Sequence, residues 1–221
     1  MTLRRALVLA AGRGERMRPL TLATPKPLLS VGGKPLIAWH LERLAQNGIR
    51  EVAINTSWLA SQLHAALGDG LDYGVQIQWF DEGPEPFETA GGIRNALSYF
   101  GDEPFLVING DVWTTIPFPR QLPAGRLAHL MLVANPPQHP GGDFGLECGE
   151  LRSIGPKRYT FSGIGVYDPA LFSQLSPGRR ALRPILDRAS SAGWVTAEVS
   201  TQAWVDVGTP ERLAALDAAL A

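Results

Sequence analysis

The chain has 221 residues, enough for one sizeable α/β domain spanning residues 1–221. Hydrophobic residues make up 45% of it and charged residues 19%, as in ordinary globular proteins. The formal net charge of −1 gives no reason to expect a nucleic-acid or membrane surface, so small molecules are the expected partners.

The single cysteine, Cys148, excludes an intramolecular disulfide and suits a reducing compartment. The apolar run after Arg4 and Arg5 is short and is interrupted by the polar segment 12–16, unlike a signal peptide. No apolar run approaches the roughly 20 residues of a membrane helix. We therefore expect a cytoplasmic protein, and the sequence indicates no oligomeric state.

Strands and helices alternate through the first half of the chain. Short apolar runs predict strands, and apolar stripes at helical spacing bounded by proline or glycine predict helices. The expected strands are 6–9, 51–55, 75–80 and 105–109, and the expected helices are 35–47, 58–67 and 89–99. This βαβ rhythm predicts an α/β fold with a Rossmann-like, mostly parallel sheet and helices on both faces.

The second half is less regular. Further strands are expected at 128–135 and 160–167, separated by a proline- and glycine-rich loop at 135–142 and a hairpin at 146–154. Helices are expected at 182–193 and 210–221. We interpret the irregular part as a small β excursion over the active site of a single domain.

A glycine- and arginine-rich segment, residues 9–21, follows the first expected strand. Gly12 and Gly14 let the backbone approach a ligand and point N–H groups at an anion. Three arginines lie in the same segment, and Lys26 stands just beyond it between two prolines. Positive charge in such a turn favours a phosphate site over a turn with solvated arginines.

Two commoner phosphate loops are excluded. A P-loop requires Gly-Lys-Ser/Thr where this chain has Gly14-Glu15-Arg16. The dinucleotide fingerprint requires a third glycine where Met17 stands. The phosphate loop therefore belongs to another class.

Polar side chains follow the expected strands of the first half. Ligands of open α/β sheets bind beyond the carboxyl ends of the strands. The glycine-rich loop follows the first strand, Asn55 ends the second, Glu82 follows the third and Asp111 follows the fourth. We expect these residues to converge on one crevice.

Asp111 and Asp206 are the candidate metal ligands. A carboxylate that closes an apolar strand, as Asp111 does, costs stability unless it has a partner. A plain turn aspartate is the alternative, because Gly-Asp is common in turns. Asp206 stands in a similar context before Gly208, and two carboxylates with phosphate oxygens are a typical magnesium environment.

These motifs resemble the signature of the sugar-1-phosphate nucleotidyltransferases, in the right order along nearly the whole chain. The glycine-rich loop is similar to the family's triphosphate loop, and segments 107–111 and 204–210 are similar to its two metal-aspartate motifs. The resemblance implies a nucleotide-diphospho-sugar transferase fold and a Mg²⁺ cofactor held by Asp111 and Asp206.

The resemblance also implies roles for the other candidates. Arg16, Lys26 and Asp111 would act in catalysis. The implied nucleotide-binding residues are Ala11, Gly12, Arg13, Gly14, Lys26, Asn55, Glu82, Glu88, Gly91 and Asn109. The implied sugar-binding residues are Asn109, Asp143, Ser162 and Gly163, although a solvated loop aspartate is an alternative for Asp143.

The implied reaction is attack by a sugar-1-phosphate oxygen on the α-phosphorus of a nucleoside triphosphate, with release of pyrophosphate. The nucleophile is already an anion at pH 7, so no general base is needed. This agrees with the lack of a Ser/His or His/Asp constellation in the sequence. The metal, Arg16 and Lys26 would neutralise the charge that accumulates between the two phosphorylated substrates.

Segments 53–59, 85–93, 109–113, 142–144 and 161–164 resemble the branch of the family that uses UTP and N-acetylmuramate 1-phosphate in peptidoglycan recycling. Ala90 departs from the glycine expected there. Two alternatives stay open: a mannose-1-phosphate guanylyltransferase, which shares the phosphate and metal motifs, and a catalytically silent regulatory subunit of the same fold.

Overall fold

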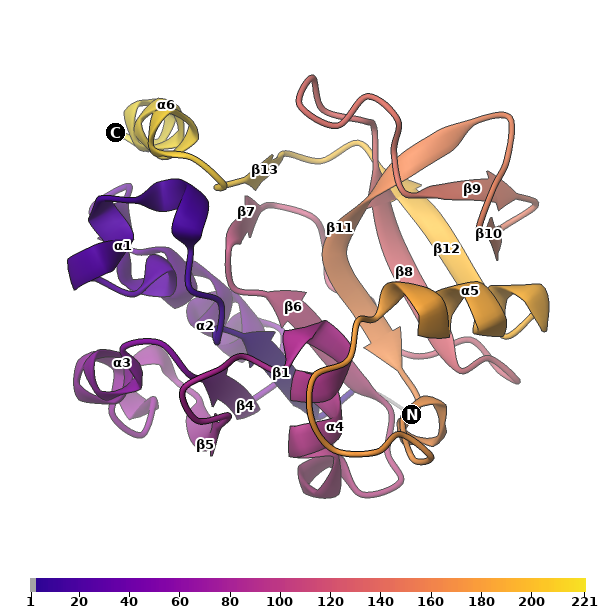
Figure 1. Cartoon of the computed structure of the whole chain (residues 1–221), viewed down its shortest axis with the longest axis horizontal. Coiled ribbons are helices and arrows are strands. Elements are labelled where there is room, and N and C mark those ends of the chain that lie inside the picture. Colours follow the sequence, from indigo (N-terminus) through magenta and orange to yellow (C-terminus); the bar gives the residue numbers. More distant parts are fainter. Residues whose placement is uncertain (1–2) are drawn as a thin grey trace.

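A computed structural model describes residues 3–221, and a large sheet forms its centre (Figure 1). Within this part of the chain the sheet has nine strands in the order β5-β4-β1-β6-β11-β8-β12-β10-β9. The strands are β1 (Arg5–Leu9), β4 (Glu51–Thr56), β5 (Gln76–Asp81), β6 (Phe105–Asn109), β8 (Ala128–Val133), β9 (Phe144–Glu147), β10 (Glu150–Arg152), β11 (Arg158–Tyr167) and β12 (Val195–Ser200).

The first half of the sheet is parallel, as the βαβ rhythm predicted. β5 pairs with β4, β4 with β1, and β1 with β6, all in the same direction. Parallel neighbours need a crossover connection. The crossovers contain α2 (Leu36–Gln46), α3 (Ala60–Leu67) and α4 (Glu88–Phe100).

The whole sheet is mixed, and the prediction of a mostly parallel sheet was wrong for the second half. β11 runs antiparallel to both β6 and β8, and β10 runs antiparallel to β12 and β9. Between β6 and β11 the described chain contains strands and loops but no crossover helix. β8 and β12 are parallel, and the connection between them includes α5 (Arg183–Ser191).

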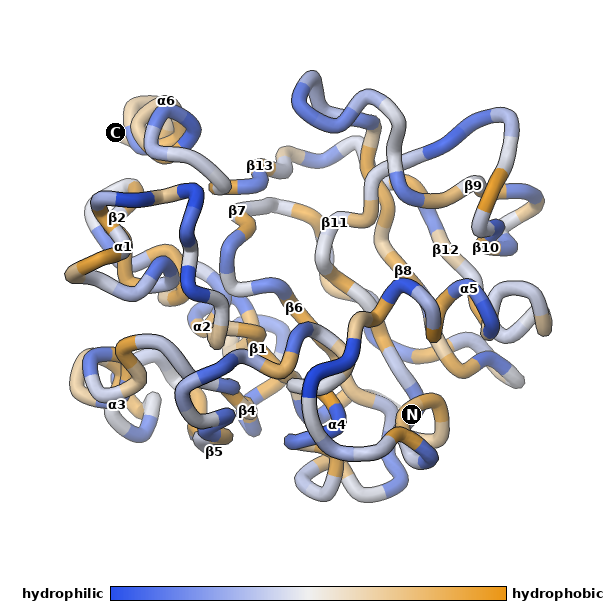
Figure 2. Tube along the Cα trace, in the orientation of Figure 1, coloured by the Kyte–Doolittle hydropathy of each residue, from blue (hydrophilic) through white to orange (hydrophobic). Residues whose placement is uncertain are grey.

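Alternate residues of β1 enter two separate hydrophobic clusters. Ala6 and Val8 belong to a cluster with α2 and α3, whereas Leu7 belongs to a cluster with α4 and α5. Successive side chains of a strand point to opposite faces, so the two clusters lie on opposite sides of β1. Figure 2 shows hydrophobic residues gathered along β6 and β8 inside the molecule.

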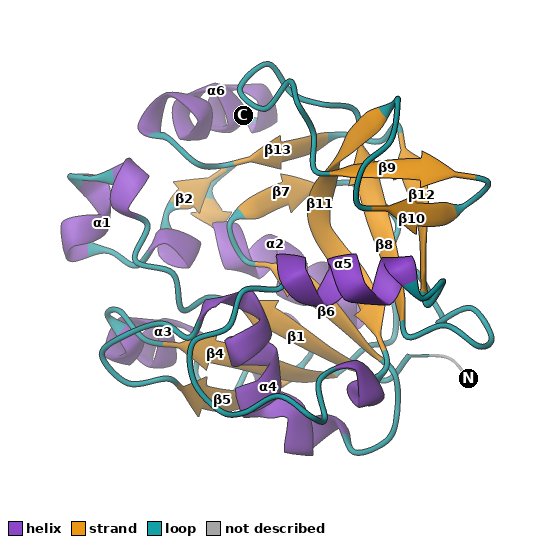
Figure 3. Ribbon diagram, turned by 45° about the vertical axis from the view of Figure 1, so that its right-hand side comes forward, coloured by secondary structure: helices purple, strands orange, loops and turns teal. Residues whose placement is uncertain are grey.

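Two short two-stranded sheets lie outside the main sheet. β2 (Ser30–Val31) pairs with β3 (Lys34–Pro35), and β7 (Val112–Thr114) pairs with β13 (Trp204–Asp206). Figure 3 shows β7 and β13 side by side, near the C-terminal helix α6 (Pro210–Leu220). The β7–β13 pair joins the chain just after β6 to the chain just before α6.

The remaining elements are short. They are helix α1 (Leu20–Ala23) and the 3₁₀ helices η1 (Glu15–Met17), η2 (Lys26–Leu28), η3 (Leu71–Tyr73) and η4 (Pro169–Leu171). In the part of the chain that the structure describes, no helix combines the length and apolar character needed to cross a bilayer.

Candidate active site

A cleft of about 660 Å³ lies at the carboxyl ends of the parallel strands. Leu9 is the last residue of β1, Asn109 is the last residue of β6, and Asn55 is next to the last residue of β4. All three line the cleft. Convergence of the strand ends was predicted from topology. The predicted residues that line the cleft are Ala11, Gly12, Arg13, Gly14, Arg16, Lys26, Asn55, Glu82, Glu88, Asn109 and Asp111.

The glycine-rich loop forms one wall of the cleft. Gly14 adopts a left-handed conformation (φ 62°), which turns the chain into η1, and its carbonyl accepts hydrogen bonds from the Met17 amide and the Thr21 hydroxyl, each at 2.8 Å. Within residues 3–221 the amides of positions 11–13 have no hydrogen-bond acceptor. These amides and the exposed Arg16 side chain are therefore available to an anionic ligand.

The Arg13 side chain extends from the glycine-rich loop to the loop after β5. Its Nη2 donates a hydrogen bond of 2.9 Å to the Pro84 carbonyl in the loop after β5. Arg13 thus bridges the loop after β1 and the loop after β5 at the mouth of the cleft.

Lys26 and Asp111 form a direct ion pair. The Lys26 Nζ lies 2.8 Å from Asp111 Oδ2, and the Lys26 side chain is only 7% exposed whereas that of Asp111 is 39% exposed. A buried ammonium is costly without a counter-charge, and Asp111 supplies it. The predicted catalytic lysine and the predicted metal ligand are therefore in contact.

Asn55 and Glu82 line the cleft and connect the chain after β1, the end of β4 and the loop between β5 and α4. Asn55 Nδ2 donates to Glu82 Oε1 (2.6 Å), and Asn55 Oδ1 accepts from the Ala10 amide (2.7 Å). The Phe87 amide donates to Glu82 Oε2 (2.6 Å), just before α4. Burial raises the pKa of the Glu82 carboxyl against the opposing effect of these two hydrogen bonds. Both side chains thus fix the shape of the cleft.

The N-terminus of α4 is covered by residues 178–180, which run in front of this helix in Figure 1. The Arg180 carbonyl accepts hydrogen bonds from the Ala90 and Gly91 amides at 3.0 and 3.1 Å. Gly91 permits this contact, since a Cβ there would lie 2.4 Å from the Gly178 carbonyl oxygen. The structure therefore places Gly91 against residues 178–180 and not among the residues that line the cleft.

Arg179 and Gly208 line the cleft and were missed from the sequence. Arg179 Nε lies 2.6 Å from Glu88 Oε1 across the mouth of the cleft. The Gly178-Arg179-Arg180 run indicated a basic turn, but nothing local places it beside α4. Gly208 follows Asp206, so its neighbourhood was predicted although the residue itself was not.

Asp206 stands beside the strand that follows Asp111. In the β7–β13 pair Asp206 is opposite Val112, and the Val207 amide donates to the Asp111 carbonyl at 3.0 Å. Asp206 Oδ2 accepts a hydrogen bond of 2.6 Å from Arg212 Nη1. Asp206, the last residue of β13, is therefore close to the backbone of Asp111, which directly precedes β7, although Asp206 is not among the residues that line the cleft. Each of the two predicted metal ligands has a cationic partner.

His40 holds the backbone of Val112, the residue after Asp111. It is fully buried in α2, and its Nε2 lies 2.7 Å from the Val112 carbonyl, directly after Asp111. Burial lowers the pKa of this imidazole to about 4, so it is neutral at pH 7 and its Nε2–H donates to Val112. The histidine positions the backbone and has no direct contact with the cleft lining.

The structure does not place Asp143, Ser162 or Gly163 among the residues that line the cleft. Asp143 Oδ2 accepts from the Phe161 amide (2.8 Å), and Oδ1 lies 3.0 Å from His139 Nε2. Ser162 is buried and its hydroxyl donates to the Met131 carbonyl (2.8 Å). A Cβ at Gly163 would lie 2.7 Å from Asn109 Nδ2, so this glycine leaves room for the Asn109 side chain, which does line the cleft.

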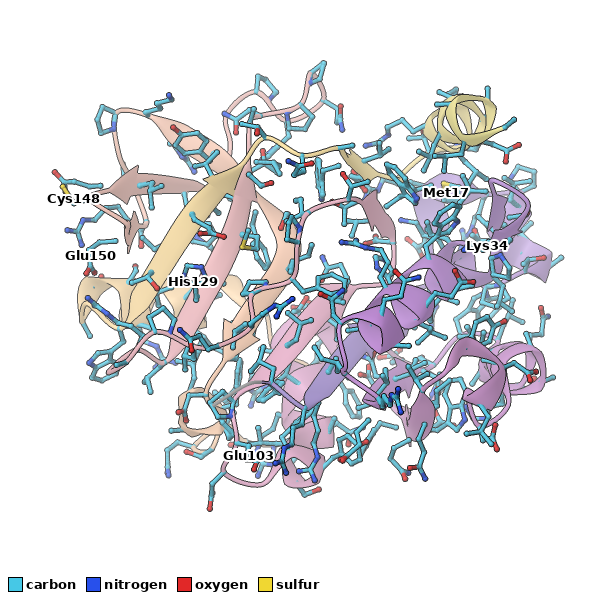
Figure 4. The ribbon with its side chains drawn as sticks, turned by 180° about the vertical axis from the view of Figure 1, so that it is seen from behind. Met17, Lys34, Glu103, His129, Cys148 and Glu150 are labelled. Atoms are coloured by element: carbon cyan, nitrogen blue, oxygen red, sulfur yellow. The ribbon has the colours of Figure 1, made fainter. Side chains whose placement is uncertain are left out.

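The irregular second half was expected to form a small β excursion over the active site, and the β9–β10 hairpin within it does not lie there. It extends the edge of the main sheet beyond β12, and none of its residues lines the cleft. In Figure 4 its residues Cys148 and Glu150 lie at the opposite end of the molecule from Met17, which lines the cleft. Backbone pairing with β12 and β11 holds the hairpin there.

Comparison with known proteins gives one family. The family model of the nucleotidyl transferases matches residues 5–146. The chain is 49% identical to N-acetylmuramate alpha-1-phosphate uridylyltransferase of Neisseria meningitidis serogroup B, over 95% of each chain. It is 30% identical to the mannose-1-phosphate guanylyltransferase catalytic subunit beta of Drosophila pseudoobscura pseudoobscura, over 94% of this chain and 60% of that protein.

Solved structures bear on the fold alone. The inositol-1-phosphate CTP transferase of T. maritima superimposes with a TM-score of 0.79 at 20% identity, over 96% of this chain and 92% of that one. The expected nucleotidyltransferase fold, with its mixture of helices and strands, is thereby confirmed.

Proposed function

This chain belongs to the sugar-1-phosphate nucleotidyltransferase family, and we propose that it joins UTP to N-acetylmuramate 1-phosphate and releases pyrophosphate. The choice of substrates rests on the 49% identity, over 95% of both chains, to the N-acetylmuramate alpha-1-phosphate uridylyltransferase of Neisseria meningitidis serogroup B. Such a reaction belongs to peptidoglycan recycling in the cytoplasm.

The polar groups of the cleft suit the electrostatic problem of this reaction. Two anions must approach each other, and negative charge accumulates on the α-phosphate as the new bond forms. The free amides of residues 11–13, Arg16 and Lys26 supply hydrogen bonds and positive charge on one wall. Donors fixed before the reaction need no reorganisation as the charge develops, which makes them effective in catalysis.

Mg²⁺ is the proposed cofactor, with Asp111 and Asp206 as its protein ligands. Among residues 3–221 no group of three or more potential ligands is present, so the protein would supply two carboxylates and the substrate phosphates the other oxygens. Each carboxylate already has a cation beside it, Lys26 or Arg212, which indicates that both positions favour positive charge. The bound metal would neutralise phosphate charge as a Lewis acid.

The substrates would be divided between different lining residues of the cleft. Glu82 and Glu88 both line it and are the residues proposed to face the nucleoside. Of the four residues proposed for the sugar, Asn109 lines the cleft and is the one we expect to contact substrate. Asp143, Ser162 and Gly163 would act on the sugar through the loop and strand that they hold in place.

A matrix of substrates tests the proposal. Each of the four nucleoside triphosphates is paired with N-acetylmuramate, mannose and glucose 1-phosphates in Mg²⁺, and pyrophosphate release is measured. We expect the highest kcat/KM for UTP with N-acetylmuramate 1-phosphate. Preference for GTP with mannose 1-phosphate would reassign the chain as a guanylyltransferase. If a folded protein released no pyrophosphate with any pair, the result would indicate a regulatory subunit. The retained Lys26, Asp111 and Asp206 argue against that outcome.

A further inference from the structure

Arg212 contacts Asp206 from the side away from the main sheet. Its Nη1 lies 2.6 Å from Asp206 Oδ2, and the side chains of both residues are about three-quarters buried, with exposures of 22% and 24%. A short ion pair between groups that are buried to this extent is stronger than an ion pair exposed to solvent. Arg212 itself is not among the residues that line the cleft.

The position of Arg212 is set by the start of α6. Thr209 caps the helix by accepting a hydrogen bond from the Arg212 amide, and helical side chains point back toward the N-terminus of their helix. Farther along, Leu216 is buried and Asp217 Oδ1 accepts from the Gly32 amide at 2.7 Å. The helix is thereby anchored, and the guanidinium is aimed at Asp206.

Gly208 makes room for this contact. A Cβ at Gly208 would lie 2.5 Å from Arg212 Nη2 and 3.1 Å from Asp206 Oδ1. Gly208 also lines the cleft. The oxygen of Asp206 that Arg212 does not hold is therefore next to a residue of the cleft wall.

We propose that Arg212 is a positioning residue, which holds Asp206 Oδ2 so that Oδ1 is directed to the cleft as a metal ligand. This inference rests on the proposed function. A carboxylate held by one oxygen loses rotational freedom before the metal arrives, and groups that orient a metal ligand typically change metal affinity about 10- to 100-fold when removed. Arg212 would act through Asp206 without touching substrate.

The test measures UTP affinity by calorimetry in Mg²⁺ and again in EDTA, with no sugar phosphate present. The ratio of the two affinities reports the metal's contribution and does not depend on turnover. In Arg212→Ala we expect this ratio to fall about tenfold while the affinity in EDTA stays unchanged. Arg212→Lys should recover part of the loss, because an ammonium can still donate to Asp206.

The matched control is Arg152→Ala, which removes the partner of Glu147 in an ion pair on the distant hairpin. It should leave the ratio as in the wild type. If Arg212→Ala does not fold, Arg212→Met decides, since methionine keeps an unbranched side chain but cannot donate to Asp206. The same fall in the ratio, with EDTA affinity retained, supports the inference.

A wild-type ratio in a folded Arg212→Ala or Arg212→Met overturns the positioning role, even if the melting temperature falls, because that result describes a purely structural ion pair. Equal UTP affinity in Mg²⁺ and in EDTA for the wild type also overturns it. A wild-type protein that binds no UTP under either condition refutes the proposed function itself.

Discussion

The two halves of the chain contribute to the site in different ways. In the first half, residues between Leu9 and Asp111 line the cleft with free amides and charged side chains. In the second half, Arg179 and Gly208 line the cleft, whereas Asp143 and Ser162 make hydrogen bonds within the protein. In our proposal the first half supplies most of the phosphate-binding surface, and the second half adds a few residues to it and supports it.

Topology explains this difference. Parallel strands place every carboxyl end at one edge of the sheet, so the loops after β1, β4, β5 and β6 meet there. Antiparallel strands such as β8 and β11 send successive loops to opposite edges. Substitutions that remove charge should therefore affect catalysis strongly in the first half, and in β8–β11 of the second half they should mainly affect stability.

Asp111→Asn should have the largest effect. Loss of one preorganised charged partner in the cleft typically raises the barrier by about 3–4 kcal/mol, a few hundred-fold in kcat. The variant should fold but melt below the wild type, because the buried Lys26 ammonium keeps a hydrogen-bond acceptor and loses its counter-charge. Pyrophosphate release with saturating UTP is the measurement, and turnover close to that of the wild type would remove Asp111 from the mechanism.

His40 should make the support beneath Asp111 sensitive to acid. Burial lowers the pKa of His40 from 6.5 in the unfolded chain to about 4, so the unfolded chain binds the proton more readily. The neutral His40 therefore contributes to the free energy of unfolding. This contribution is complete above pH 6.5 and is lost as the pH falls toward 4, for a total of about 3 kcal/mol. Urea unfolding of wild type and His40→Gln at both pH values checks it. A difference between the two proteins that does not change with pH would contradict a buried neutral His40.

Lys26→Ala should weaken UTP binding in Mg²⁺. A charged hydrogen bond contributes about 1.5–3 kcal/mol, so we expect affinity to fall between about 10- and 100-fold. Arg18→Ala is the control, because Arg18 pairs with Glu15 and does not line the cleft. Equal losses in the two variants would mean that general positive charge, and not the position of Lys26, attracts the nucleotide.

Asp143→Ala should have the smallest effect on the nucleotide. The carboxylate accepts from the Phe161 amide and contacts His139, so its removal should lower the free energy of unfolding by about 1–2 kcal/mol. UTP affinity should stay unchanged, and KM for the sugar phosphate should rise only as far as the loop loosens. Unchanged stability together with a large rise in that KM would show direct contact with the sugar.

The first half of the fold was predictable because its signals are local. Apolar runs bounded by glycine or proline located β6 at 105–109 and α2 to within a residue or two. Parallel topology then predicted that Asn55, Glu82 and Asp111 would converge, and they do. Lys26 was predicted as a phosphate contact, although its ion pair with Asp111 was not.

The parts that were missed depend on contacts between distant segments. The β7–β13 pair joins Val112 to Asp206, and the Arg180 carbonyl caps α4 through Ala90. Neither strand is long enough to give a period-two pattern, and no local feature of 178–180 indicates its partner. Ser162 was expected to contact the sugar but is buried within β11, where the pairing with β8 shifts register between Phe161 and Gly165.

Crystals grown with UTP and Mn²⁺ would test the central claim most directly, because the anomalous signal locates the metal independently of the nucleotide. We expect the triphosphate against residues 11–16 and a manganese peak bonded to carboxylate oxygens of both Asp111 and Asp206. A triphosphate bound elsewhere, or a manganese ion that touches neither aspartate, would contradict it.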